Sequence, residues 1–289
     1  MDINTAFSEL KNEFEAISYQ ERKTREIFKK MLEDNSRSID LIEAKHGDDS
    51  SFGSSHNMWF ERADNREIVG YGRMRLSHKD IRSLLIKQRN RQYQWLLAEA
   101  YEAYEDFIEK VCAVVGARDA TLWNNKQKLK LENAIGYQMI IDTIRKSTSE
   151  FSSMKLLKSL RNRFDQIKQL EKNNAFKSDL RFFLSLIEQL RHQIVHTKGI
   201  IGNTNLFFKR VLKGIGLSRS TEWENRIRFY LDEHIDGTAV IFLSDRPVNE
   251  NSILPQYINV IDHLISMLLS HALIVVEATE GGLFGKDGN

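Results

Sequence analysis

The stretch WLLAEAYEAYEDFIEKVCAVVG, residues 95–116, decides the fold class of this chain. Its apolar residues recur at alternating steps of four and three, which places them on one face of an α-helix. The opposite face is acidic, and Gly116 stands where such a helix would end. We therefore predict a helix over about residues 77–115 that packs its apolar stripe into a core. That stripe consists of Leu97, Tyr101, Tyr104, Ile108, Val111 and Val115.

Helical spacing returns on both sides of this segment. It is found near the N-terminus, twice between residues 129 and 172, again before Gly199, and in a C-terminal helix over about residues 254–278. Residues 45–58 are rich in glycine, serine and aspartate and predict a loop. Alternating residues around Asp236-Gly237 predict a β-hairpin over about 226–243. The expected fold is mostly α: an N-terminal helical extension over residues 1–75, then a helical bundle over 76–289 with the hairpin before its last helix.

Composition narrows the classes of function. The single cysteine, Cys112, lies on the apolar stripe and is expected to be buried; one cysteine excludes a disulfide framework within the chain and a multi-cysteine zinc site. The N-terminus has no secretory-signal pattern, and the apolar run 264–276 is short for a bilayer. We therefore expect a cytoplasmic protein without a membrane partner.

The charge is unevenly distributed although the net charge is only +2. Residues 151–215 contain 13 lysines and arginines against 4 acidic residues, whereas the chain from residue 216 onward contains 5 against 11. A localised basic surface suits a polyanionic partner such as nucleic acid, and it also suits a solvated helical surface with no partner.

Within the basic segment, LRHQIVH (residues 190–196) places two histidines four residues apart on one helix face. The outline resembles a zinc-peptidase helix, but that chemistry needs glutamate after the first histidine, and Gln193 cannot take a proton. Glu188, His192 and His196 are spaced four residues apart and could share one helix face as a different metal site. No other feature of the sequence supports such a site. An ordinary polar helix edge is the remaining structural interpretation.

The arrangement Arg191, then the polar His192, then His196 resembles the signature of the HEPN family (higher eukaryotes and prokaryotes nucleotide-binding domain). That family forms a bundle of four to five helices with the motif near the end of a late helix. The resemblance covers about residues 81–202 and the C-terminal helix. Lys198 differs from the tyrosine found there in the branch paired with nucleotidyltransferase antitoxins.

The resemblance implies a metal-independent endoribonuclease without a cofactor, of the toxin or abortive-infection type, that acts on RNA as a homodimer with a composite active site. It implies catalytic roles for Arg191 and His196, a positioning or proton-transfer role for His192, and RNA contacts by Thr197 and Lys198. Glu188 is expected to be a solvated acid or a partner of the His192 ring. An antitoxin or other regulatory partner is not identified by the sequence. The alternative is a HEPN-like module that binds RNA or protein without cutting.

The residue types suit that chemistry. RNA carries its own nucleophile, the 2′-hydroxyl, so cleavage needs proton transfer and charge stabilisation. Histidine transfers protons near neutral pH. Arginine presents a fixed fork of donors that matches phosphate oxygens.

Overall fold

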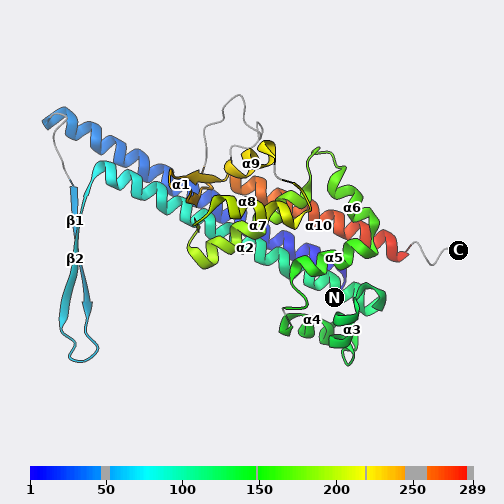
Figure 1. Cartoon of the computed structure of the whole chain (residues 1–289). Helices are drawn as coiled ribbons and strands as arrows, with labels where there is room; N and C mark the ends of the chain where they lie inside the picture. The colour runs from blue at the N-terminus through cyan, green and yellow to red at the C-terminus, as the bar shows by residue number, and fades with distance from the viewer. Residues whose placement is uncertain (47–52, 148, 219, 245–258, 285–289) are drawn as a thin grey trace. The chain divides into compact units, whose positions relative to one another are not determined.

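The fold is mostly helical, as the sequence predicts, with helices over 73% of the chain. The computed structural model describes residues 1–46, 53–147, 149–218, 220–244 and 259–284. Figure 1 shows its elements in chain order. The helices are α1 (Ile3–His46), α2 (His78–Arg118), the 3-10 helix η1 (Ala120–Leu122), α3 (Asn125–Leu131), α4 (Gly136–Lys146), α5 (Ser153–Arg163), α6 (Asp165–Lys172), α7 (Leu180–Thr197), α8 (Thr204–Gly214), α9 (Thr221–Arg228) and α10 (Val260–Phe284). The strands are β1 (Gly53–Glu61), β2 (Ile68–Ser77), β3 (Ile200–Ile201), β4 (Leu231–Glu233) and β5 (Ala239–Ile241).

The chain divides into two compact units. The first comprises residues 1–19 and 93–289, and the second comprises residues 20–92. This division does not coincide with the expected boundary at residue 75, because α1 and α2 each contribute residues to both units.

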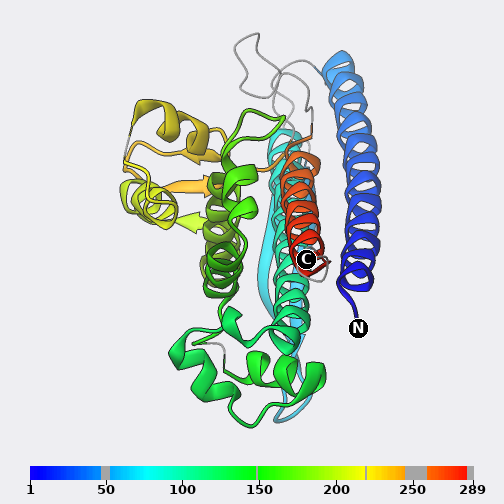
Figure 2. The ribbon, with the colours of Figure 1, turned by 90° about the vertical axis from the view of Figure 1, so that its right-hand side faces the viewer.

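The core of the first unit forms around the second half of α2. All six residues of the predicted stripe are at most 2% exposed, and Cys112 is buried among them as predicted. Burial raises the pKa of the Cys112 thiol. Figure 2 shows α10, in red, beside this part of α2, and the Tyr104 hydroxyl of α2 lies 2.7 Å from Nδ1 of His271 in α10. Arg191 of α7 also bonds to Glu102 of α2. The start of α1 joins the same unit, where Lys110 Nζ lies 2.7 Å from Glu9 Oε2.

Gly116 has a different role from the predicted one. The helix continues past it to Arg118, so this glycine does not end α2. A Cβ at Gly116 would lie 2.0 Å from Cζ2 of Trp123. The position therefore needs glycine because the buried indole of Trp123 packs directly on the helix backbone.

The predicted hairpin is present but shorter. β4 and β5 pair antiparallel around Asp236-Gly237, while residues 226–228 belong to α9 instead. A third strand, β3, pairs with β5 and follows directly after α7. The Nε2 of Gln94 donates to the carbonyl of Ile241 at 2.7 Å, which ties this small sheet to α2.

The second unit corrects the prediction for residues 1–75. Residues 53–61 and 68–77 form an antiparallel hairpin. Of the expected 45–58 loop, residues 45–46 therefore belong to α1 and residues 53–58 to β1, and residues 47–52 lie outside the described residues. The glycine and serine content indicated a loop. These residues can nevertheless form a strand, because the hydrogen bonds between paired strands are made by the backbone. Gly70 and Gly72 stand opposite Trp59 and Met58, and the Met58 sulfur fills the space above Gly72.

The C-terminal helix begins later and ends later than predicted, at Val260–Phe284, and residues 254–258 lie outside the described residues. Within the described part of the chain, one helical stretch, Val260–Gly281, is long and apolar enough to cross a membrane, and 67% of an 18-residue segment of it is buried in the fold. The length argument from residues 264–276 was therefore wrong. The expectation of a buried helix is met, because this stripe packs against α6 and α7.

Candidate functional site

The predicted motif occupies the last two turns of α7, and both ends of this helix are closed by hydrogen bonds. At its start, the carboxylate of Asp179 accepts the backbone N–H of Arg181 at 3.0 Å. At its end, Lys198 adopts a left-handed conformation with φ of 57°, and the N–H of Gly199 donates to the carbonyl of Gln193 at 3.0 Å. These caps hold the motif residues on a rigid helix.

Arg191 points to the acidic face of α2. Its Nη2 donates to Oε1 of Glu102 at 2.9 Å, and the side chains of Arg191 and Glu102 keep 28% and 56% of their surface exposed. The Nε of Arg191 is buried without a hydrogen-bond partner among the described residues. Because a guanidinium has five N–H donors, Arg191 retains binding capacity beyond its bond to Glu102.

His192 and His196 lie one turn apart on the exposed face of α7. Their ring centroids are 4.6 Å apart and their planes are inclined by 54°. Although the His192 ring is largely exposed, partial desolvation lowers its pKa, and the nearby charges of His196, Arg210 and Arg191 lower it further. His192 is therefore neutral near neutral pH and able to accept a proton.

A cavity of about 400 Å³ opens beside Arg191 and His192. It lies between α2, α7 and α8, whereas His196 contacts His192 without lining it. The structure thus brings Arg191 and His192 together in one cavity and leaves His196 next to them on the outer face. The cavity is lined by Tyr101, Glu105, Glu188, Gln189, Arg191, His192 and Arg210.

Two carboxyl groups in this cavity have altered acidity. Burial raises the pKa of Glu188, and the neighbouring charge of Glu105 raises it further. Burial also raises the pKa of Glu105, against the opposing effect of the Ser153 hydroxyl, which donates to its Oε1 at 2.7 Å. Glu188 is therefore a half-buried member of the cavity, contrary to the expectation of a solvated acid. It forms no hydrogen bond with His192 within the described part of the chain.

Four of these cavity residues were missed by sequence reasoning. Glu105 belongs to the acidic face of α2 and Tyr101 to its core stripe, whereas Gln189 and Arg210 were not singled out. The acidic face of α2 was visible in the sequence, but no local pattern indicates that it meets α7.

Thr197 and Lys198 lie at the end of the motif helix and differ in the hydrogen bonds of their side chains. The Thr197 hydroxyl lies 2.5 Å from the carbonyl oxygen of Ile200 and 2.8 Å from that of Gln193, so it closes the helix end. The side chain of Lys198 is exposed. Contact of these two residues with RNA stays a prediction.

A second polar cluster, which the sequence did not reveal, lies entirely inside the first unit. Arg161 Nη2 donates to Oε1 of Glu171 at 2.6 Å, and Nε2 of His271 lies 2.7 Å from the same oxygen. The hydroxyl of Tyr104 lies 2.7 Å from Nδ1 of His271. Glu171 and His271 are fully buried. We call Tyr104, His271, Glu171 and Arg161 the buried chain.

Burial has opposite effects on the two acid–base groups of the buried chain. Burial favours the neutral carboxyl of Glu171, but the hydrogen bond and charge of His271 and the charge of Arg161 outweigh it, so the pKa of Glu171 is lowered. Burial lowers the pKa of His271 in spite of the neighbouring Glu171. A neutral His271 ring that donates from Nε2 to Glu171 and accepts the Tyr104 O–H at Nδ1 satisfies every partner.

Among the described residues, no group of three or more histidine, cysteine, aspartate or glutamate side chains is placed to hold a metal ion. The helical set Glu188, His192 and His196 therefore does not converge, because Glu188 faces Glu105 in the cavity and His196 lies outside it.

Comparison with protein-family models, curated proteins and solved structures gave no match to this chain.

Proposed function

We propose that this chain is a metal-independent endoribonuclease of the HEPN type, acting in the cytoplasm as a toxin or an antiviral, abortive-infection effector. The observation that carries the proposal is the position of Arg191, which is 28% exposed and bonded to Glu102 through Nη2, beside the neutral ring of His192 in a cavity of about 400 Å³. A cavity of that volume lies within the range of about 300–1,000 Å³ that is typical of ligand sites. The biological role follows from the family resemblance alone.

The proposed reaction uses the 2′-hydroxyl of RNA as the nucleophile. Its oxygen attacks the adjacent phosphorus as a base removes its proton, and the bond from phosphorus to the 5′-oxygen breaks as an acid protonates that oxygen. The products are a 2′,3′-cyclic phosphate and a 5′-hydroxyl. Arg191 would bind the non-bridging oxygens, His196 would act in proton transfer, and His192 would position the phosphate.

The carboxyl groups of the cavity bear on phosphate binding. Two ionised carboxylates would repel a phosphate, and the raised pKa values of Glu105 and Glu188 shift both groups toward their neutral forms, which lessens that repulsion.

The reaction uses both an acid and a base, and one motif helix presents one His196. A symmetric homodimer would place a second Arg191 and His196 across the twofold axis and complete a composite site. Mixing Arg191→Ala chains with His196→Ala chains tests this. Heterodimers regain partial activity if two chains build one site, whereas an active monomer in light scattering contradicts the composite site and gives His192 the second proton-transfer role.

Incubation of the purified protein with total RNA in EDTA tests the proposed activity. We expect cleavage to persist in EDTA and to leave 2′,3′-cyclic phosphate and 5′-hydroxyl ends. An RNA with a 2′-deoxy sugar at the cut site should resist cleavage. Products with 5′-phosphate ends, or activity that vanishes in EDTA and returns with magnesium, would contradict the mechanism.

The second candidate is a HEPN-like helical module that binds RNA or protein without cutting. The ion pair between Arg191 and Glu102 favours it, because Glu102 already occupies part of the guanidinium fork. Binding of RNA by the intact protein, without cleavage under any of the conditions above, would select this candidate.

A further inference from the structure

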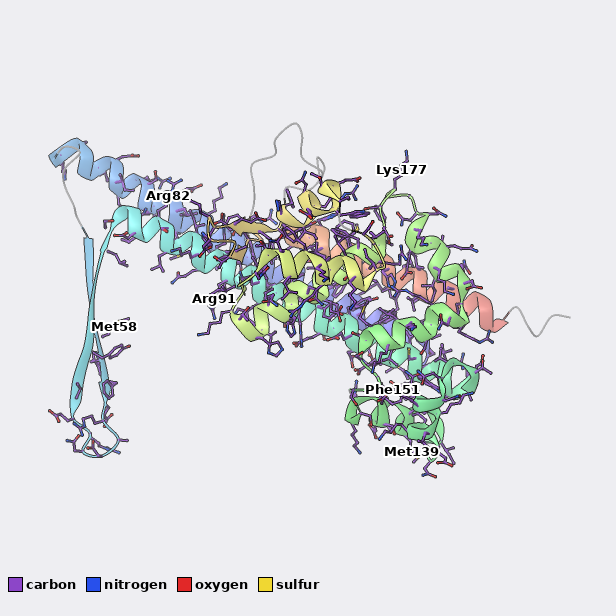
Figure 3. All side chains as sticks on the ribbon, viewed as in Figure 1. Met58, Arg82, Arg91, Met139, Phe151 and Lys177 are labelled. Carbon is purple, nitrogen blue, oxygen red and sulfur yellow. The ribbon has the colours of Figure 1, made fainter. Side chains whose placement is uncertain are left out.

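Two adjoining pockets lie on the exposed side of α5, away from the cavity at Arg191. The first, of about 590 Å³, extends from η1 and α3 to α5, and the second, of about 230 Å³, extends from α5 to α6 and the start of α7. Both are lined by Lys158 and Asn162. We call the two pockets together the α5 groove; Figure 3 labels Phe151, just before α5, and Lys177, in the loop after α6.

Most arginines of the α5 groove already have acidic partners. Arg163 Nη2 lies 2.6 Å from Asp119, Arg181 Nη2 lies 2.5 Å from Asp179, and Arg161 binds Glu171. These guanidinium groups therefore add little net charge to the groove.

Of the five lysines that line the groove, Lys168 is paired with Asp165 at 2.8 Å, and the other four have no acidic partner among the described residues. Lys126, Lys155, Lys158 and Lys172 are exposed, and none forms an ion pair with a carboxylate among the described residues. The hydrogen bond of Lys155 goes to the neutral carbonyl of Ser149. Apart from the acids paired with arginine, Glu150 is the one acidic residue that lines the described groove. Four unpaired positive charges against one negative charge predict an anionic ligand.

The shape of the groove indicates a ligand with repeated negative charges. Two pockets in succession share Lys158, and the amide of Asn162 adds a neutral donor at the same place. A phosphodiester backbone presents charge at regular steps along a flexible chain, which suits such a succession of pockets.

The α5 helix also connects this groove to the cavity. Ser153, its first residue, donates to Glu105 in the wall of the cavity, and Lys155 follows two residues later. A strand held along α5 would therefore be bound by the same helix that supports the cavity.

We propose that the α5 groove binds the phosphodiester backbone of single-stranded RNA as a second contact region for the substrate of the cavity. The identification of the polyanion as RNA rests on the proposed function. Each lysine that contacts a phosphate contributes through release of condensed counterions, so its effect depends on salt and not on base sequence.

The test measures binding of a labelled single-stranded RNA oligonucleotide by fluorescence anisotropy in EDTA. It uses the full-length chain with His196→Ala, so that cleavage does not interfere. A triple variant Lys155→Gln, Lys158→Gln, Lys172→Gln removes charge from the groove. The matched control Lys128→Gln, Lys130→Gln, Lys146→Gln removes the same charge from exposed lysines of α3 and α4 that do not line it.

We expect the groove variant to bind at least about tenfold more weakly than its parent. Affinity falls as salt rises, and each phosphate contact contributes about 0.7 to the steepness of log affinity against log salt. Loss of three such contacts should therefore make this dependence shallower by about 2 between about 50 and 200 mM salt. The control should change affinity less than about twofold. Equal weakening by both variants, no effect of the groove variant, or no RNA binding by the parent chain would overturn the inference.

The outcomes separate this inference from the proposed function. Binding that is lost with Arg191→Ala and unaffected by the groove variant would overturn the groove and leave the cavity as a nuclease site. Groove-dependent binding by a wild-type chain that never cleaves RNA would support the groove and contradict the nuclease.

Discussion

The cavity at Arg191 and the buried chain at His271 use the same kinds of side chain in opposite ways. In the buried chain, Arg161 and His271 both bind Glu171, and Tyr104 occupies the second nitrogen of His271. At the cavity, Arg191 has one bond to the half-exposed Glu102, and its guanidinium, on a side chain that is 28% exposed, has further N–H donors.

This difference separates a structural role from a binding role. Buried polar groups that satisfy one another hold elements together and leave nothing for a ligand. The buried chain joins α2, α5, α6 and α10 in this way. Groups at a surface cavity that keep free donors and acceptors can exchange water for a ligand. The partners of an arginine, a histidine or a carboxylate therefore indicate whether it has a structural role or can bind a ligand.

The largest expected effect is the loss of RNA cleavage when motif residues at the cavity are replaced. Arg191→Ala and His196→Ala should each lower RNA cleavage by about 10²–10⁴-fold, because each removes a charge-stabilising or proton-transfer group. His192→Ala should have a smaller effect if it positions the substrate. Cleavage rates and circular dichroism provide the measurement; intact activity in a folded Arg191→Ala protein would remove the site from consideration.

The buried chain should instead control stability. Glu171→Ala leaves Arg161 and His271 without their acceptor and should lower the free energy of unfolding by about 3–5 kcal/mol. Arg191→Ala breaks an exposed ion pair and should change it by less than about 1 kcal/mol. Urea unfolding followed by circular dichroism measures both. Similar losses in the two variants would contradict a structural role for the buried chain and a binding role for the cavity.

The pH dependence of stability should also come from buried groups. The pKa of His271 is lowered, and burial lowers that of His263 from 6.5 to about 4. In the unfolded chain these rings take up protons at higher pH than in the fold. Their contribution is therefore complete above about pH 6.5 and is lost as the pH falls toward 4. The lowered pKa of Glu171 extends the loss to lower pH.

Variant His263→Leu isolates one part of this pH effect. A shift from 6.5 to about 4 corresponds to a stability change on the order of 3 kcal/mol. We expect unfolding free energies of His263→Leu to depend less steeply on pH between 6.5 and 4 than those of the wild type. Urea unfolding at a series of pH values measures the slopes, and parallel slopes would show that His263 does not titrate in this range.

The smallest expected effect is that of Glu102. The variant Glu102→Gln should change stability by less than about 1 kcal/mol, because the ion pair is exposed. It should also strengthen RNA binding by up to about fivefold, since a carboxylate no longer competes with phosphate for Arg191. Anisotropy measures the affinity. Weaker binding would indicate that Glu102 positions Arg191 for the phosphate.

Much of the helical fold was predictable because it depends on local patterns. The apolar stripe of α2 is buried as predicted, and a β-turn at Asp236-Gly237 joins paired strands. The first hairpin was missed because its strands contain glycine and serine, and their stability comes from pairing between strands. The end of α2 was misplaced because Gly116 serves packing with Trp123 and not helix termination.

The sequence by itself determined the mostly helical fold, the buried stripe of α2 and the position of Arg191, His192 and His196 in the last turns of α7, because helical periodicity is a local property. Only the tertiary structure decided their surroundings. Arg191 meets Glu102 across 89 residues of chain, and His271 meets Glu171 across 100. Periodicity shows which face of a helix is buried, but packing of the whole core determines which faces meet.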